Sequence, residues 1–206
     1  MPIFTPDTEP YLSLESVRNF DLHIVRAMQY YENFGLKTLS TDLSPLQAAA
    51  CEIVPQGVSI ALSIRELIRQ AYLYSALILM RPLVERTGTI NLLICKPDML
   101  LHWHSGWPRK KQPSFDTLLK YAFPKATKEE NEVTRNILHK LIHSDPSGSK
   151  FNLQSHSHSS LMTFASGKEL NASHKTDAVC RVSTDCLKQL ITASVGTFLY
   201  PDGSNA

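Results

Sequence analysis

The chain has 206 residues, a length that suits one compact domain able to bury roughly 70% of its unfolded surface. Hydrophobic residues make up 43% of it and the formal net charge is only +2, which excludes a general electrostatic attraction to nucleic acid and requires any such binding to come from a local patch. The four cysteines are scattered along the chain, which predicts reduced thiols. The chain does not start with a basic segment followed by an apolar leader, and it has no apolar run of ~20 residues. We therefore expect a cytoplasmic protein with no membrane segment.

Amphipathic helices are predicted in the first quarter of the chain. Apolar residues recur at three- and four-residue steps over residues 12–34, which predicts a helix that ends at Gly35. Ser44 as cap and Pro45 in the first turn predict the start of a second helix. We expect residues 55–57, Pro-Gln-Gly, to break it.

The run from residue 58 to 94 is too apolar on all sides for a surface helix and predicts a buried central helix. Pro82 lacks a backbone donor and clashes with the preceding turn, so we expect a kink, or two helices that meet near Met80 and Arg81. Arg81 and Glu85 lie one turn apart and predict an ion pair that fixes the helix register. Alternatively, the pair faces the basic helix described below and orients its histidines.

Two short accessory helices follow, from Pro97 to Trp103 and from Ser114 to Phe123. The chain between them combines an aromatic ring, on which a base could stack, with cations that could hold phosphates. These candidate nucleic-acid-binding residues are Trp107, Arg109, Lys110 and Lys111. The alternative is a solvated cationic loop without a ligand.

Residues 127–148 are the most informative stretch, because they predict a bounded helix with two different halves. Thr127 and Glu130 match the capping box that starts a helix, and residues 145–148, Asp-Pro-Ser-Gly, end it. On a helical wheel, apolar and polar side chains occupy opposite halves. The apolar half holds Val133, Thr134, Ile137, Leu138, Leu141 and Ile142; the polar half holds Arg135, Asn136, His139, Lys140 and His143.

Arg135, His139 and His143 recur at four-residue steps and form what we call the basic stripe. Arginine holds phosphate oxygens in a fixed fork and histidine titrates near neutral pH. The stripe is therefore a candidate catalytic site for metal-independent cleavage of RNA, with Arg135 on the phosphate and His139 or His143 as acid and base. The alternative is a solvated helix face with His143 near the helix end.

A zinc site is a further alternative. The candidate ligands are His139 and His143, completed by Glu132 or by His156 and His158. Lys140 occupies the position where a metalloprotease helix carries its glutamate, so we predict no metal and no cofactor. The histidines of residues 102–104, His-Trp-His, are a second candidate pair that we expect to be a surface or interface element.

Residues 144–175 are rich in Ser, Asn, Gly and His and predict an irregular loop. The last helix is predicted from Thr176 to Tyr200, with residues 201–203, Pro-Asp-Gly, as its stop. No stretch alternates as a strand would, so the whole chain, residues 1–206, predicts a single all-α domain: an up-and-down helical bundle with a kinked central helix.

Three phrases, RPLVER at residues 81–86, HKLIHSDP at 139–146 and VCRVSTDCL at 179–187, resemble a group of uncharacterised bacterial helical proteins. That group looks like a branch of the HEPN superfamily of four-helix bundles, and the likeness spans residues 55–200. HEPN ribonucleases pair an arginine and a following polar residue with a histidine at a short spacing. Arg135 and Asn136 match the first half, while three and seven residues separate Arg135 from the two histidines of the stripe.

The resemblance implies a homodimer whose facing bundles bring two basic stripes together. It also implies an endoribonuclease of a toxin–antitoxin or phage-defence system, with an antitoxin or another defence protein as partner. HEPN-like bundles without the catalytic motif serve as binding or dimerisation modules. The alternative function is therefore a non-catalytic, dimeric interaction module that acts through its apolar faces and its basic loop.

Overall fold

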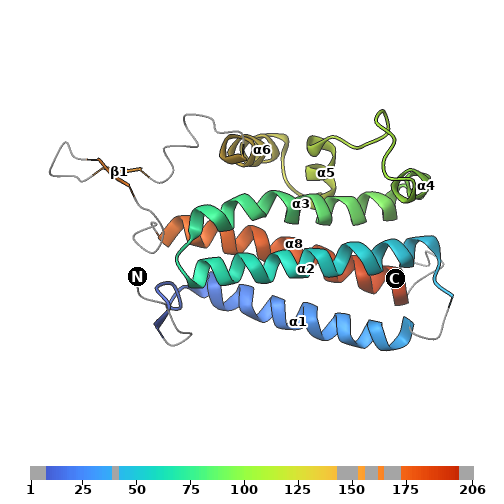
Figure 1. The fold of residues 1–206 in the computed structure, drawn as a ribbon, viewed down its shortest axis with the longest axis horizontal. Coiled ribbons are helices and arrows are strands. Elements are labelled where there is room, and N and C mark those ends of the chain that lie inside the picture. The colour runs from blue at the N-terminus through green and yellow to red at the C-terminus, as the bar shows by residue number, and fades with distance from the viewer. Residues whose placement is uncertain (1–7, 39–41, 143–152, 156–161, 165–172, 200–206) are drawn as a thin grey trace.

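The computed structural model describes residues 8–38, 42–142, 153–155, 162–164 and 173–199, and within these ranges the predicted all-α class is confirmed. Long helices packed side by side form the body: α1 (Glu15–Thr38), α2 (Pro45–Arg69), α3 (Leu73–Cys95) and α8 (Ser173–Leu199). Shorter helices lie along the outer side of α3: α4 (Met99–His104), α5 (Phe115–Ala122) and α6 (Lys128–Ile142) (Figure 1). In the described ranges no helix combines the length and the apolar character needed to cross a membrane.

The helices α1, α2 and α3 alternate in direction, as expected for an up-and-down bundle (Figure 1). The last helix departs from that pattern, because α8 runs parallel to α3 rather than antiparallel to it (Figure 1). The segment with α4, α5 and α6 carries the chain back along the bundle before α8 begins. These short helices therefore form a second layer on the α3 side, while α1 lies on the opposite side.

The helix ends predicted at residues 55–57 and at Gly35 are wrong, and so is the alternative of two helices that meet near Met80 and Arg81; the kink expected at Pro82 stays a prediction. Pro55 lies inside α2 and Pro82 inside α3, and neither ends its helix. Likewise α1 continues through Gly35 to Thr38. Each proline removes only one backbone donor, and the long apolar faces of α2 and α3 pack well enough to hold the helix on both sides of it.

The junction inside the predicted central helix lies at Gln70–Tyr72, not at Met80–Arg81. Ala71 adopts a left-handed conformation, with φ of 62°. The Ala71 N–H donates to Ile68 O at 2.9 Å and the Tyr72 N–H donates to Leu67 O at 2.7 Å. This pair of hydrogen bonds is a Schellman motif, which ends α2 although glycine is absent.

Local capping predictions are confirmed. The Gln47 N–H donates to Ser44 Oγ at 3.3 Å and the Ser44 N–H donates to Gln47 Oε1 at 2.9 Å, so α2 begins with a capping box. At α5, the Thr117 N–H donates to Ser114 Oγ at 3.2 Å. Both helices start where their serine caps predicted.

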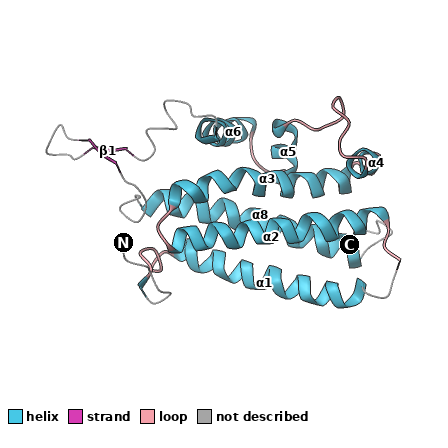
Figure 2. Ribbon diagram, in the orientation of Figure 1, coloured by secondary structure: helices cyan, strands magenta, loops and turns pink. Residues whose placement is uncertain are grey.

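The expectation of no strand is wrong within the predicted irregular loop. Strand β1 (Leu153–Ser155) pairs antiparallel with β2 (Met162–Phe164), and Leu153 lies opposite Phe164 (Figure 2). Three residues are too few for an alternating pattern to stand out in the sequence. The loop also ends earlier than predicted, since α8 begins at Ser173.

A partly buried cation, Arg65, joins the N-terminal segment to the bundle. Arg65 Nη2 lies 2.6 Å from Glu9 Oε1, and Arg65 Nε lies 2.5 Å from Asp21 Oδ1 on α1. Burial alone would lower the pKa of Arg65, but its hydrogen bonds to Asp21 and Glu9 raise that pKa above its ordinary value. The network ties α1 and the chain before it to α2.

Two glycines mark the closest approaches between elements. A Cβ added at Gly88 of α3 would lie 2.2 Å from the carbonyl oxygen of Leu118 in α5. A Cβ added at Gly57 of α2 would lie 2.5 Å from a methyl group of Leu190 in α8. The first contact is with backbone, which cannot rotate away, whereas the second is with the tip of a flexible side chain.

We expect Gly88→Ala to destabilise the protein by about 3 kcal/mol, because the added methyl group forces α5 off α3. Gly57→Ala should cost less, since the Leu190 side chain can change rotamer. Gly196→Ala is the matched control in α8: no atom lies within 4 Å of the added Cβ, so helix propensity should raise stability by about 1 kcal/mol. Guanidinium unfolding measures all three, and equal stability of the Gly88 and Gly196 variants would contradict the close α3–α5 contact.

Candidate functional site

The basic stripe lies on α6, whose start matches the prediction. The Thr127 N–H donates to Glu130 Oε2 at 2.7 Å and the Glu130 N–H donates to Thr127 Oγ1 at 3.2 Å, so the predicted capping box is confirmed. The helix is described as far as Ile142. His143 and the predicted stop at residues 145–148 lie outside the described residues.

The predicted division of α6 into two halves is partly wrong. Leu138 and Leu141 are buried, and Tyr74 Oη of α3 donates to Leu141 O at 3.3 Å. Val133 and Ile137, which we assigned to the apolar half, are 58% and 50% exposed. The buried side of α6 is therefore narrower than predicted and is rotated away from Val133 and Ile137. A narrow stripe of contacts with α3 and α5 is enough to hold the helix.

Arg135 lies at the edge of the buried face and contacts α5. Its Nη1 lies 3.4 Å from Asp116 Oδ2, its Nη2 lies 3.5 Å from Glu132 Oε1, and Nη2 also donates to Asn136 Oδ1 at 3.2 Å. Two carboxylates therefore balance the guanidinium charge. Because all these groups are largely solvent-exposed, the ion pairs contribute little to stability.

A groove of about 640 Å³ runs between α5 and α6, and Arg135 belongs to its wall. Its lining combines apolar side chains with three cations and two carboxylates. We call it the α5–α6 groove, lined by Asp116, Leu119, Lys120, Phe123, Pro124, Ala126, Lys128, Asn131, Glu132 and Arg135. His139 lies one turn further along α6, is exposed, and is not part of this lining.

Arg81 and Glu85 form the predicted ion pair, with Nε and Oε1 3.0 Å apart. The Arg81 guanidinium also stacks over the Phe115 ring, 4.6 Å from its centroid. Phe115 directly precedes Asp116, the α5 partner of Arg135. Two arginines, one from α3 and one from α6, thus meet consecutive residues at the start of α5, and Arg81 contacts that helix rather than the stripe.

The candidate nucleic-acid loop begins at a second Schellman motif. The Gly106 N–H donates to Trp103 O at 2.9 Å and the Trp107 N–H donates to His102 O at 2.8 Å. The turn folds Trp107 back, so its indole is half-buried against the core. The cations that follow are fully available to a ligand: Arg109, Lys110 and Lys111 are all exposed.

Candidate metal ligands are dispersed. Among the residues that the structure describes, no three His, Cys, Asp or Glu side chains are grouped so that they could hold a metal ion. Of the predicted zinc ligands, His143, His156 and His158 lie outside those residues. His104 Nε2 lies 3.3 Å from Pro45 O, a contact between α4 and the start of α2, so this histidine belongs to an interface inside the chain.

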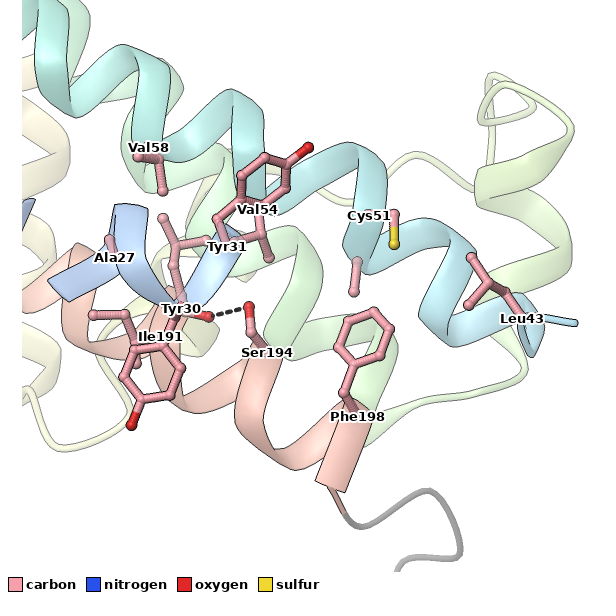
Figure 3. A pocket seen from close by; sticks show the side chains of 12 residues that line it. Ala27, Tyr30, Tyr31, Leu43, Cys51, Val54, Val58, Ile191, Ser194 and Phe198 are labelled. Atoms are coloured by element: carbon pink, nitrogen blue, oxygen red, sulfur yellow. Dashed lines mark hydrogen bonds between the residues drawn. The ribbon is translucent and has the colours of Figure 1, made fainter. Parts of the chain in front are cut away.

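A second concavity of about 270 Å³ lies between α1, α2 and α8, and Figure 3 shows its side chains. None of its lining residues is charged, so it suits an uncharged apolar group rather than a phosphate. The Ser194 hydroxyl within it donates to Leu190 O at 2.9 Å. Lining residues come from three distant segments: Ala27, Tyr30, Tyr31, Leu43, Ala50, Cys51, Val54, Val58, Leu190, Ile191, Ser194 and Phe198.

The cysteines offer no activated nucleophile. Burial raises the pKa of the Cys180 and Cys186 thiols to about 12. Burial and the nearby Glu52 carboxylate also raise the pKa of Cys51, at the wall of the apolar cavity. Cys95, by contrast, is exposed.

Comparisons of the chain with models of protein families, with curated proteins and with solved structures found no match. The resemblance to HEPN bundles therefore stays a prediction.

At pH 8 we expect iodoacetamide to label Cys95 first, Cys51 more slowly, and Cys180 and Cys186 only after unfolding. A thiol pKa near 12 leaves about a thousandfold less thiolate than the ordinary value of 9.0, and burial blocks access as well. Below pH 9 these thiols are protonated in both the folded and the unfolded chain, so they leave the free energy of unfolding unchanged; as the pH rises from 9 toward 12 they ionise only in the unfolded chain, and the free energy of unfolding should fall. Peptide mass spectrometry of the native protein measures this order, and early labelling of Cys186 would contradict its burial.

Proposed function

We propose that the protein binds RNA through the layer formed by α4, α5 and α6. The observation that carries the proposal is the distribution of charge. Residues 96–142 hold nine Lys and Arg side chains against five Asp and Glu, a formal net charge of +4, whereas the whole chain has +2. We call these residues the basic layer; the remainder of the chain is net acidic. A polyanion is therefore attracted more strongly to the basic layer than to the rest of the chain.

The α5–α6 groove supports this proposal because it offers an extended surface within the basic layer. Lys120, Lys128 and Arg135 contribute cations to its lining, and Phe123 contributes an aromatic ring. The exposed run Arg109–Lys111 lies shortly before α5 in the chain. Single-stranded RNA is bound in this way elsewhere, with cations along the phosphates and aromatic rings under the bases.

The finer proposal is that the bound RNA is also cleaved, without a metal. Arg135 would hold the scissile phosphate, and His139 or His143 would take the 2′-hydroxyl proton and return one to the leaving oxygen. The four-residue spacing of the stripe supports this role, since it places successive groups about 6 Å apart along one helix.

A non-catalytic RNA-binding or interaction module is the second candidate. The observation that favours it is the coordination of Arg135: Asp116 and Glu132 already occupy the guanidinium that a phosphate would need. A phosphate must displace at least one carboxylate before it can be held at two points.

For binding, we expect the double variant Arg109→Ala/Lys110→Ala to weaken the affinity for single-stranded RNA and to flatten its salt dependence. Each lost phosphate contact reduces the slope of log K against log salt by about 0.7, so the two together should reduce it by about 1.4. Fluorescence anisotropy with a labelled oligonucleotide over a salt series measures both quantities. The positions are exposed, so the fold should be unaffected.

The matched control is Arg26→Ala/Arg181→Ala, which removes the same charge from exposed positions on α1 and α8, outside the basic layer. We expect its salt slope to equal that of the wild type. If both double variants lose affinity equally, binding follows net charge alone and the proposed surface is wrong.

For cleavage, we expect the purified protein to cut single-stranded or transfer RNA in the presence of EDTA. Arg135→Ala should slow the reaction, and loss of the acting histidine, His139→Ala or His143→Ala, should slow it by a factor of about 10² to 10⁴. Gel analysis of end-labelled RNA gives the rates. Intact RNA with wild type and all three variants would remove the enzyme and leave the binding module.

A further inference from the structure

The outward side of α1 carries apolar side chains that the fold does not cover. Its inner side, with Val17, Phe20, Ile24 and Ala27, is buried in the bundle as a surface helix requires. The opposite side should then be polar. Instead Leu22, Val25 and Met28 are 46%, 50% and 42% exposed.

These three residues form one compact patch. At about 100° per residue, Leu22 and Met28 lie 60° to either side of Val25 around the helix. Val25 is therefore the centre of the patch, and the patch faces away from α2 and α8. We call it the α1 patch.

Opposite charges bound the α1 patch along the helix. Arg18 and Glu32 stand seven residues before and after Val25, within about 20° of it around the helix and about 10 Å from it on either side. Both side chains are exposed, and neither forms an ion pair with another residue that the structure describes. Asp21 and Gln29 lie on the same face, about 40° to either side of Val25, and the Asp21 carboxylate is paired with Arg65. The charges of this face without an ion-pair partner among the described residues are thus arranged in the order cation, apolar centre, anion.

We propose that the α1 patch binds a second copy of this chain, with the two α1 helices antiparallel about a two-fold axis at Val25. In that arrangement the two Val25 side chains meet at the centre, flanked by Leu22 and Met28. Arg18 of each copy lies opposite Glu32 of the other, so two ion pairs close the ends. A parallel pairing would place like charges against each other.

The order of charges selects this occupant. When a second copy of this face is turned end to end, its anion lies opposite the first copy's cation and the two apolar centres meet. Such self-complementarity is the requirement of an isologous two-fold contact. A single helix face is at the small end of interface sizes, so we expect dissociation in the micromolar range.

The dimer would place the basic layers of the two copies on its outer sides, since α1 lies across the bundle from α4, α5 and α6 (Figure 1). RNA binding and self-association would then use separate surfaces. Failure of one proposal can be told from failure of the other, because the α1 variants below should retain RNA binding.

Sedimentation equilibrium over a concentration series, from about 1 to 200 µM, tests the proposal. We expect a monomer–dimer equilibrium in the wild type. Arg18→Glu or Glu32→Arg alone places like charges together at both ends and should raise the dissociation constant at least tenfold. The combined variant Arg18→Glu/Glu32→Arg restores opposite charges and should return it to within about threefold of the wild type.

Arg26→Glu is the matched control, with the same charge change on the same helix but about 100° away from the centre of the patch. It should leave the dissociation constant unchanged, and circular dichroism confirms that each variant is folded. A wild type that stays monomeric throughout overturns the proposal. So does a dimer that the two charge reversals leave unchanged, which would point to another surface such as the exposed Val133 and Ile137 of α6.

Discussion

The arrangement of the basic layer depends on one close backbone contact, between Gly88 of α3 and the Leu118 carbonyl of α5. Without a side chain at residue 88, the short helix α5 can lie directly on α3. Arg81 then reaches the Phe115 ring, and Asp116 becomes available to Arg135. Since α6 packs its narrow buried stripe against both α3 and α5, the groove between α5 and α6 depends on where α5 rests.

Partly buried and exposed ion pairs have different roles in this protein. The partly buried network around Arg65 ties elements together, because Arg65 on α2 binds both Asp21 on α1 and Glu9 before it. The exposed pairs of Arg135 contribute little to folding but set the local charge of the groove. The proposed RNA binding relies on the exposed pairs of Arg135, because a phosphate of the RNA can compete there with the protein's own carboxylates.

Features encoded by neighbouring residues were predictable from the sequence. The caps at Ser44, Ser114 and Thr127 involve residues three apart, so each could be recognised without knowledge of the fold. The end of α2 could not, because Ala71 carries no signal for the left-handed conformation that tertiary packing imposes on it. The prolines gave the opposite error. A helix end was predicted at Pro55 and a junction of two helices near Pro82, but both helices continue, because long buried helices tolerate a missing hydrogen bond.

In the candidate site, too, local features were predictable from the sequence and tertiary contacts were not. The stripe residues Arg135 and His139 could be placed on one helix, but the groove needs α5, which the sequence did not connect to them. The rotation of α6 depends on which side meets α3, and that contact is not local. The apolar cavity between α1, α2 and α8 could not be predicted either, because its walls come from three segments far apart in the chain.

The parallel course of α3 and α8 has a consequence for how the molecule can vary. A chain that ends α3 must travel the length of that helix, about 34 Å, before α8 can begin, and roughly ten extended residues would span it. Residues 96–142, with α4, α5 and α6, lie along this return path instead. The basic layer is therefore an elaborated crossover, whose length and surface can change while the register of the long helices stays the same.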